Sequence, residues 1–491
     1  MTVDKEFASL LGEVEQRLSR HGYDPADLYT LRRLLRARTV PTGPDPDEPG
    51  RGVILPPVSL PSRDELAVEA RRSRRLWELY QVRDWAVRRR PVLCGQVLSD
   101  ADATAFVEDF TIRPEATLDR SAVRGDDPAV LRLWQPALAA GAIDIRHVRG
   151  TADGRGPVEA VAHATTLDDT DDEVLRMWRA GFDWTLRFAE HRGRGTVLER
   201  HSYRTAERVL AALLFELYVR RGPLDMAGAV TRLLGDLVGE AVAGETMSSR
   251  ERAQVRTRTF AAVRFALTRL MGHGAVRRGT FGNYELTPLG LWGMNVRLSD
   301  TGHIAPVRGS LATASAEALL RCLVGYTGRE RMEEFDAWRG SRSDAQAVRE
   351  LLTAADRMGP GDRVQALVLV DRMRTGVESA IREAASGVLI GPHCRAWLSA
   401  RGHGEAPSVE DRAHVLVDEV IAASRDGSPE EFVAGLRGLV SPAQYELIPV
   451  AARIPHPSVP EMLRLLFELH PDWTVTAVTG LLSQRLSPDD P

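Results

Sequence analysis

Lysine is almost absent from this sequence of 491 residues. Lysine and arginine together number 64, and Lys5 is the only lysine, so the other 63 basic residues are arginines. Schiff-base chemistry with pyridoxal phosphate or a carbonyl substrate would have only Lys5, close to the N-terminus, to use. The phosphate loop of nucleotide hydrolases and the nucleotide-binding strand of protein kinases each need a lysine in a fixed motif, and neither motif is present. The scarcity of lysine therefore excludes several large enzyme classes.

Cysteine and long apolar runs are scarce as well. The three cysteines, Cys94, Cys322 and Cys394, are far apart and form no C-x-x-C pair, which excludes a cysteine zinc finger and argues against a disulfide framework. The N-terminus is charged throughout and lacks the apolar core of a signal peptide. No stretch approaches the ~18 apolar residues of a membrane span. We expect a cytoplasmic protein that makes no membrane contact.

Recognisable catalytic chemistry is also missing. No HExxH, GxSxG, GxGxxG or EF-hand pattern occurs. The acidic run at 168–173 lacks the spaced ligands of a calcium loop and is more typical of a helix N-terminus. His393 and Cys394 are adjacent, but adjacency in sequence does not give the geometry of a nucleophile and its base. We therefore predict no catalytic, cofactor-binding or metal-binding residues, and an enzyme with scattered catalytic residues stays a third alternative.

Composition shifts divide the chain into five segments. Residues 1–40 read as helical, and seven prolines in 41–62 predict an extended linker. Two mixed segments follow, at 63–195 and 196–300, and the rest of the chain from 313 to 491 reads as helical. The overall formal charge is only −4, so the chain as a whole is not a polycation.

The first mixed segment begins with an arginine-rich helix, predicted from Ser62 to about Ala86. Its arginines indicate either a solvated polar face or a surface that follows phosphates. Further helices are expected at 99–110 and 128–141, and strands at 142–148 and 158–163. Two helices followed by a two-stranded hairpin predict a winged-helix-like unit.

The second mixed segment repeats this order. We expect helices at 203–220, 224–242 and 250–271, strands at 275–278 and 283–286, and a closing helix capped by Thr287 and Pro288. The two junctions can be overlaid, because LWQPALAAGAI at 133–143 and LTRLMGHGAV at 267–276 both run from an apolar helix end through Gly-Ala into a strand. The alternative is a coincidence of ordinary helix–turn–strand patterns.

Positive charge is concentrated in the second segment. Residues 249–297 contain nine arginines and two acidic residues, a local formal charge of +7. A basic third helix and a basic wing are the electrostatic pattern of a DNA-binding winged helix. The corresponding part of the first segment is close to neutral, which favours a structural or protein-contact role there.

A helical wheel places Phe260, Val263, Leu267, Leu270 and Met271 on the buried arc of the third helix. Arg252 and Arg256 fall on the same side, so the helix either extends beyond the core or pairs them with acids. The predicted DNA contacts lie opposite the arc, at its edge or in the wing: Arg258, Arg264, Arg269, Arg277 and Arg278. The alternative is a solvated or ion-paired face.

The C-terminal segment contains eleven predicted helices between 315 and 486. Short Gly- or Pro-containing links join helices of about 10–16 residues, which is typical of a stack of helix pairs. No fixed repeat length persists, so we describe this segment as HEAT-like rather than as a HEAT repeat.

Three motifs carry a family resemblance: Gly95–Asp102, Leu133–Ile143 and Leu286–Trp292, the last containing LTPLGLW. With them the sequence resembles poorly characterised actinobacterial multidomain proteins that have tandem winged-helix-like units and a HEAT-like C-terminal region. The resemblance covers about 78–400. It implies an architecture and no activity.

The sequence thus predicts a mainly α protein with tandem winged-helix-like units and a HEAT-like all-α region. We expect a non-enzymatic protein that binds double-stranded DNA, as a transcriptional regulator does, and that contacts a protein partner or itself through 313–491. The alternative is a protein–protein interaction scaffold that uses the same surfaces without DNA.

Overall fold

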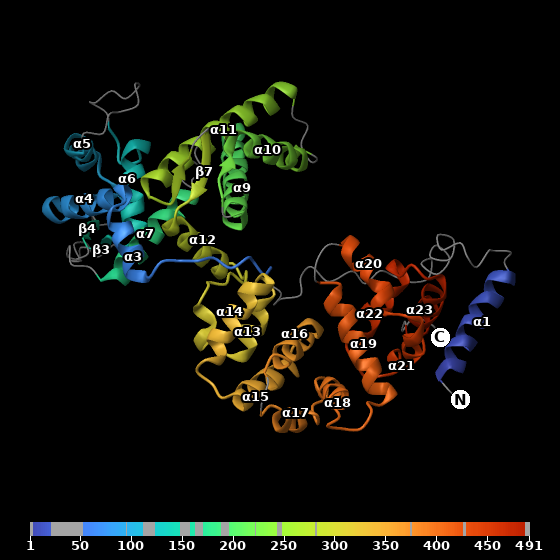
Figure 1. The fold of residues 1–491 in the computed structure, drawn as a ribbon. Coiled ribbons are helices and arrows are strands. Elements are labelled where there is room, and N and C mark those ends of the chain that lie inside the picture. Colours follow the sequence, from blue (N-terminus) through green and yellow to red (C-terminus); the bar gives the residue numbers. More distant parts are fainter. Residues whose placement is uncertain are drawn as a thin grey trace. The chain divides into compact units, whose positions relative to one another are not determined.

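The chain folds into two compact units (Figure 1). The mixed unit consists of Val58–Ala305, and the helical unit combines Met1–Pro57 with Pro306–Pro491. The computed structural model describes residues 3–20, 53–94, 96–110, 123–147, 158–162, 170–187, 196–220, 222–242, 248–279, 282–373, 376–425 and 429–486. The expectation of a mainly α protein is confirmed. Most of the predicted N-terminal helix beyond Arg20, and residues 41–52 of the predicted linker, lie outside the described residues.

The helical unit contains α1 from near the N-terminus and all helices after residue 305. Its elements are α1 (Val3–Arg20), η3 (Ser310–Thr313), α13 (Ala316–Leu323), α14 (Gly328–Arg339), α15 (Asp344–Ala355), α16 (Pro360–Val370), α17 (Glu378–Ala384), α18 (Gly391–Ala400), α19 (Val409–Ala423), α20 (Pro429–Leu439), η4 (Pro442–Gln444), α21 (Leu447–Ala451), α22 (Val459–Leu469) and α23 (Trp473–Leu486). Each predicted helix has a counterpart, except that 441–453 divides into η4 and α21. No helix among the described residues of either unit is long and apolar enough to cross a membrane.

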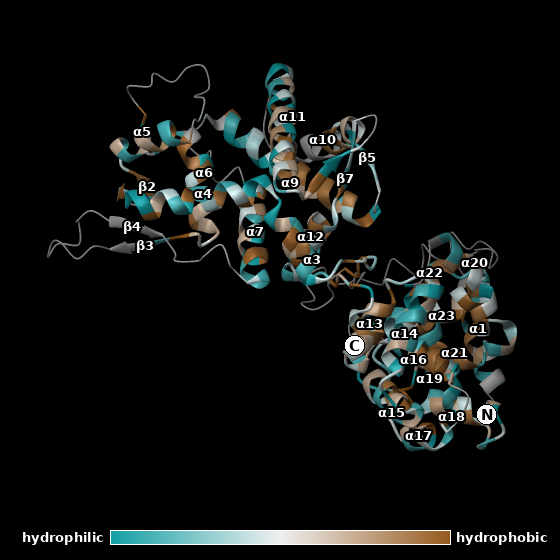
Figure 2. Cartoon of the chain, turned by 60° about the vertical axis from the view of Figure 1, so that its left-hand side comes forward, coloured by the Kyte–Doolittle hydropathy of each residue, from teal (hydrophilic) through white to brown (hydrophobic). Residues whose placement is uncertain are grey.

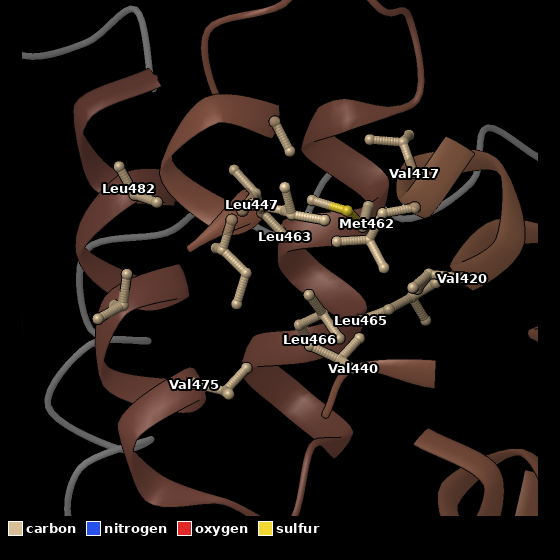
Figure 3. Packing of buried hydrophobic residues seen from close by; sticks show 14 of the residues in the cluster. Val417, Val420, Val440, Leu447, Met462, Leu463, Leu465, Leu466, Val475 and Leu482 are labelled. Carbon is tan, nitrogen blue, oxygen red and sulfur yellow. The ribbon is translucent and has the colours of Figure 1, made fainter. Parts of the chain in front are cut away.

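Two apolar clusters form the interior of the helical unit. One lies among α13–α18 and includes the fully buried rings of Phe335 and Trp338. The other lies among α19–α23, where side chains such as Met462 and Leu466 pack (Figure 3). Leu10 and Val14 of α1 belong to this second cluster, since α1 packs against α21 and α23. The chain's first helix therefore completes the core built by its last ones.

The first half of the mixed unit has one four-stranded sheet. Its elements are α3 (Arg63–Arg71), α4 (Arg74–Arg89), β1 (Val92–Cys94), β2 (Val97–Leu98), α5 (Asp100–Asp109), α6 (Pro128–Ala139), β3 (Ile143–His147), β4 (Val158–Ala162) and α7 (Asp171–Leu186). The strand order is β2-β1-β4-β3, with all neighbours antiparallel. The predicted helix from Ser62 to Ala86 is wrong as a single element, because Ser73 accepts a hydrogen bond from the Leu76 amide and starts a new helix, α4.

The second half has a three-stranded sheet. Its elements are α9 (Val197–Arg220), β5 (Leu224–Asp225), α10 (Met226–Val242), α11 (Ser249–Gly272), β6 (Val276–Arg278), β7 (Asn283–Leu286) and α12 (Pro288–Asp300). The strand order is β5-β7-β6. The two halves share one strand pairing. In the first half β1, which precedes helices α5 and α6, pairs with β4. In the second half β5, which precedes helices α10 and α11, pairs with β7.

The two helix-to-strand junctions have the same backbone geometry. Gly141 and Gly274 both have positive φ, +66° and +69°. The amide of Ala142 bonds to the Ala137 carbonyl at 2.9 Å, and the amide of Ala275 bonds to the Leu270 carbonyl at 3.0 Å. This is the hydrogen bonding of a glycine-terminated helix C-terminus. The overlay of the two junctions in the sequence therefore corresponds to a repeated local structure.

The LTPLG segment is explained by close packing at the start of α12. Thr287 caps the helix by accepting a hydrogen bond from the Gly290 amide at 3.1 Å, and Pro288 occupies the first turn. A Cβ on Gly290 would lie 1.9 Å from the carbonyl oxygen of Ala275. Glycine at this position lets α12 approach the start of β6.

Candidate nucleic-acid interface

Helix α11 is the basic helix of the second half, and its start is defined by a capping box. The Ser248 hydroxyl accepts a hydrogen bond from the Glu251 amide, and the Glu251 carboxylate accepts one from the Ser248 amide at 2.8 Å. One side of the helix packs on α9 through Val255 and Val263, which are both 1% exposed. Thr259 is fully buried there, and its hydroxyl donates to the Ser202 carbonyl. These contacts fix which side of α11 faces solvent.

The predicted buried arc is correct for Val263, Leu267 and Leu270 and wrong for Phe260. Phe260 is 41% exposed, and Val255, Thr259 and Ala266 are buried instead. The arc is rotated because α9 covers the side of α11 that carries Val255 and Thr259.

The N-terminal end of α11 extends beyond this core. Residues 249–254 are all exposed, and so is Arg256. Figure 2 colours α11 by the hydropathy of its residues, with hydrophilic residues in teal and hydrophobic ones in brown. The sequence left two explanations for Arg252 and Arg256, a helix that extends beyond the core or pairing with acidic residues. The structure supports the first, because both side chains are exposed where the helix extends beyond the core. Neither arginine forms an ion pair with any residue in the described part of the chain.

Two of the predicted contact residues are exposed and have no acidic partner among the described residues. Arg264 on α11 and Arg278 on β6 are exposed, and no ion pair to a described residue is formed by either. Two others are exposed but paired. Arg258 lies 3.5 Å from Glu199, and the Nε of Arg277 donates to Glu285 at 2.6 Å, a hydrogen bond that raises the pKa of Arg277.

Arg269, the fifth predicted contact, does not reach the surface. It is 8% exposed, and its Nη2 donates to the carbonyl oxygen of Arg132 at 3.4 Å. Its guanidinium carbon lies 4.9 Å from the ring centre of Trp184. Residues of α6 and α7, more than 80 positions away in sequence, cover this part of α11. A helical wheel of α11 alone cannot predict this burial. Arg269 is therefore not part of the candidate interface.

The exposed arginines without an acidic partner among the described residues thus follow α11 and continue into β6. They are Arg250, Arg252, Arg256, Arg264 and Arg278. Their only side-chain hydrogen bond to a described residue runs from Nη2 of Arg252 to the Ser249 hydroxyl. Sequence reasoning missed Arg250 as a contact, although its exposure follows from its place in the first turn. It also set aside Arg252 and Arg256 because they align with the core arc.

Arginines of the first half have a different environment. Arg71 pairs with Asp171 at 2.7 Å, and Arg74 and Arg75 both donate to Glu78. Arg83 is 4% exposed and lies over the ring of Tyr80. The exposed members of this group, Arg71 and Arg74, are thus ion-paired, whereas Arg75 and Arg83 are largely buried and do not belong to a solvated face.

The other two candidates from the sequence, the acidic run at 168–173 and the pair His393 and Cys394, have structural contacts. Asp171 and Asp172 lie in the first turn of α7, capped by Thr170, while Asp168 and Asp169 are outside the described residues. His393 bonds to Asp418, and Cys394 is fully buried, so desolvation raises the pKa of its thiol to about 12. A protonated, buried thiol is a poor nucleophile.

The dense aromatic residues of α7 are part of a core. Trp178 and Phe182 are at most 1% exposed, and their rings stack with centroids 5.1 Å apart. Trp292 of the LTPLGLW motif packs on Trp178 at 5.7 Å. They are unavailable for stacking on bases.

A cavity of about 630 Å³ is an open groove between α6, β3 and α7. It contains two carboxylates, Asp144 and Asp183, and Asp183 is paired with Arg297 at 3.2 Å. No histidine is among its described lining residues. In the described part of the chain, no group of three or more His, Cys, Asp or Glu side chains is placed to hold a metal ion.

Comparison with known proteins found no matching family model, no matching curated protein and no matching solved structure. The family resemblance of the sequence therefore stays a prediction.

Proposed function

We propose that residues 196–300 form a winged helix that binds double-stranded DNA. The proposal is supported by the order α9-β5-α10-α11-β6-β7 and by the pairing of β5 with β7, because a helix pair followed by an antiparallel wing is the arrangement of that fold. The first half, with its similar order, is then a second winged helix of structural role. Helices α13–α23 would form a HEAT-like stack that offers a surface for a protein partner or a second copy.

The observation that carries the proposal is the row of exposed arginines on α11 and β6 that have no acidic partner in the part of the chain that the structure describes. An exposed arginine without a paired acid attracts phosphate without first breaking an ion pair. Arg264 and Arg278 are the leading contacts. Arg258 and Arg277 are secondary, because their pairs with Glu199 and Glu285 are exposed and worth only about 0–1 kcal/mol, so phosphate can compete for them.

Fluorescence anisotropy with a labelled duplex tests this proposal. The wild-type protein should bind with an affinity that falls steeply as salt rises, and the double variant Arg264→Gln/Arg278→Gln should bind more weakly. Each phosphate contact contributes about 0.9 to the slope of log K against log salt, so the slope should fall by roughly 2. Arg124→Gln is the matched control, because Arg124 is 73% exposed in the same unit and lies outside the interface. Absence of binding at low salt would sink the proposal.

One observation favours the alternative role as an interaction scaffold. Phe260 and Phe265 are 41% and 42% exposed on α11, and large exposed apolar side chains often mark protein contacts. In that case Phe260→Ser would abolish capture of a protein partner. The wild-type protein would not bind DNA, so Arg264→Gln/Arg278→Gln would cause no change in DNA binding. Binding of both ligands by the wild type, each lost in its own variant, would support both roles.

A further inference from the structure

A single aromatic side chain lies between two arginines on the exposed side of α11. Phe260 is 41% exposed, and Arg256 and Arg264, one helical turn before and after it, are exposed too. Four residues advance about 6 Å along a helix axis, so both arginines are close neighbours of the ring on the helix surface. Neither arginine has an acidic partner among the described residues. The surroundings of Phe260 therefore favour a polyanion as its partner.

Phe260 differs from Phe265, the other exposed aromatic residue of α11. Phe265 is 42% exposed, but the guanidinium carbon of Arg269 lies 5.9 Å from its ring centre. Phe260 makes no ring–ring or cation–π contact with any residue in the described part of the chain. At about 100° per residue, the two side chains point about 140° apart around the helix. They do not form one apolar patch, so Phe260 is an isolated apolar group on a basic surface.

The other side chains on the exposed face near Phe260 are short. Ala253, Thr257 and Ala261 are exposed, and the Thr257 hydroxyl donates to the Ala253 carbonyl of its own helix at 3.0 Å. A face of this kind allows another molecule to approach the helix backbone between the arginines. Protein-binding surfaces are usually marked by larger contiguous apolar patches. One ring among short and basic side chains fits the edges of base pairs better.

We propose that Phe260 contacts the C5-methyl group of a pyrimidine in the major groove of DNA, thymine being the ordinary base that carries this group. The inference rests on the proposed binding of double-stranded DNA and adds the base feature that this binding selects. The recognition helix of helix-turn-helix proteins enters the major groove, and phenylalanine is one of the side chains that pack on the thymine methyl group there.

The ring and the arginines then have separable roles. Arg256 and Arg264 contact phosphates and give the affinity its dependence on salt, because each contact releases counterions. Phe260 buries an apolar group, so it adds a preference for certain bases without changing the salt dependence. Base preference and salt slope can therefore be measured independently of each other.

Selection from a random-sequence duplex library with the full-length protein supplies the probe. The enriched duplex is prepared again with uracil in place of each thymine in turn, which removes only the methyl group. At one position uracil should lower the wild-type affinity about fourfold, the value of one buried methyl group. At the same position 5-methylcytosine should bind more tightly than cytosine by a similar factor, which assigns the effect to the methyl group rather than to the rest of thymine.

Two phenylalanine variants locate the source of this preference. Phe260→Ala should bind the thymine and uracil duplexes equally, and it should keep the salt slope of the wild type because no phosphate contact is lost. Phe265→Ala is the matched control, since it removes the same side chain at nearly the same exposure from the same helix. This control should keep the fourfold preference.

The possible failures can be told apart. Equal wild-type affinity for thymine and uracil at every position, or binding without enrichment of any sequence, would overturn the inference and leave DNA binding itself intact. A preference that survives in Phe260→Ala, or that is lost in both variants, would overturn it as well, because the ring of Phe260 would not be its source. If the wild type binds no duplex at low salt, the proposed function fails and the inference fails with it. Loss of a protein partner alone in Phe260→Ala would assign the ring to a protein contact instead.

Discussion

Arg363 is a buried arginine of the helical unit, and one carboxylate neutralises it. It is 1% exposed, and its Nε and Nη2 donate to Asp418 at 2.5 and 2.6 Å. The same carboxylate lies 2.8 Å from His393 Nε2 and 3.0 Å from His456 Nε2. Burial alone would raise the pKa of Asp418, but these hydrogen bonds outweigh it and hold the pKa far below its usual range. One side chain thus links α16, α18, α19 and the loop before α22.

Asp418→Asn should therefore destabilise the helical unit strongly. The variant leaves Arg363 buried without a counter-charge, which costs about 3–5 kcal/mol of unfolding free energy. Asp371→Asn is the matched control, because Asp371 pairs with Arg401 at the surface and is 52% exposed; its loss should cost at most about 1 kcal/mol. Urea denaturation of both variants measures the difference. Equal midpoints would show that the buried carboxylate does not hold these helices together.

At the scale of single elements, the Gly290 position gives a sharp test of how α12 meets β6. Gly290→Ala should destabilise the mixed unit by about 3 kcal/mol, since the new Cβ meets the Ala275 carbonyl and either α12 or β6 has to move. Gly435→Ala on α20 is the control, because nothing lies within 4 Å of a Cβ there. Alanine should be neutral at that site or stabilising by up to about 1 kcal/mol. Thermal unfolding compares the two, and similar Tm values would contradict the close approach.

Elements were predictable where their ends carry local signals. Gly274 ends α11 and Thr287 caps α12, as the sequence indicates, because glycine adopts positive φ without strain and a threonine oxygen binds free helix amides. The missed break between α3 and α4 also had such a signal, Ser73 with its hydroxyl on the Leu76 amide.

The candidate interface was only partly predictable, because burial depends on distant elements. Arg264 and Arg278 are exposed as expected. Arg269 is covered by Trp184 and α6, and Phe260 is left exposed because α9 packs on a different side of the helix. A helical wheel fixes which residues share a face and leaves open which face a neighbour covers.

At the scale of the whole chain, the helical unit joins the two ends of the sequence. Leu10 and Val14 of α1 lie in the same core as residues of α21–α23. Glu6 pairs with Arg453 at 2.6 Å, and Glu13 pairs with Arg485 at 2.6 Å. The apolar spacing of the first helix predicts that one of its sides is buried against other helices. The sequence does not indicate that these are α21 and α23, more than 400 residues away.

Leu10→Ala tests whether this first helix is part of the helical unit's core. Leu10 is 6% exposed, so its truncation should cost about 2–5 kcal/mol by leaving a cavity among α1, α21 and α23. Hydrogen exchange should become faster in α21 and α23. Leu486→Ala, at a side chain that is 48% exposed, should change stability by less than about 0.5 kcal/mol. The mixed unit has its own core, so exchange in α11 and DNA affinity should both stay as in the wild type. Faster exchange in α11 would show instead that the two units unfold together, and unchanged exchange in α21 and α23 would show that α1 does not stabilise them.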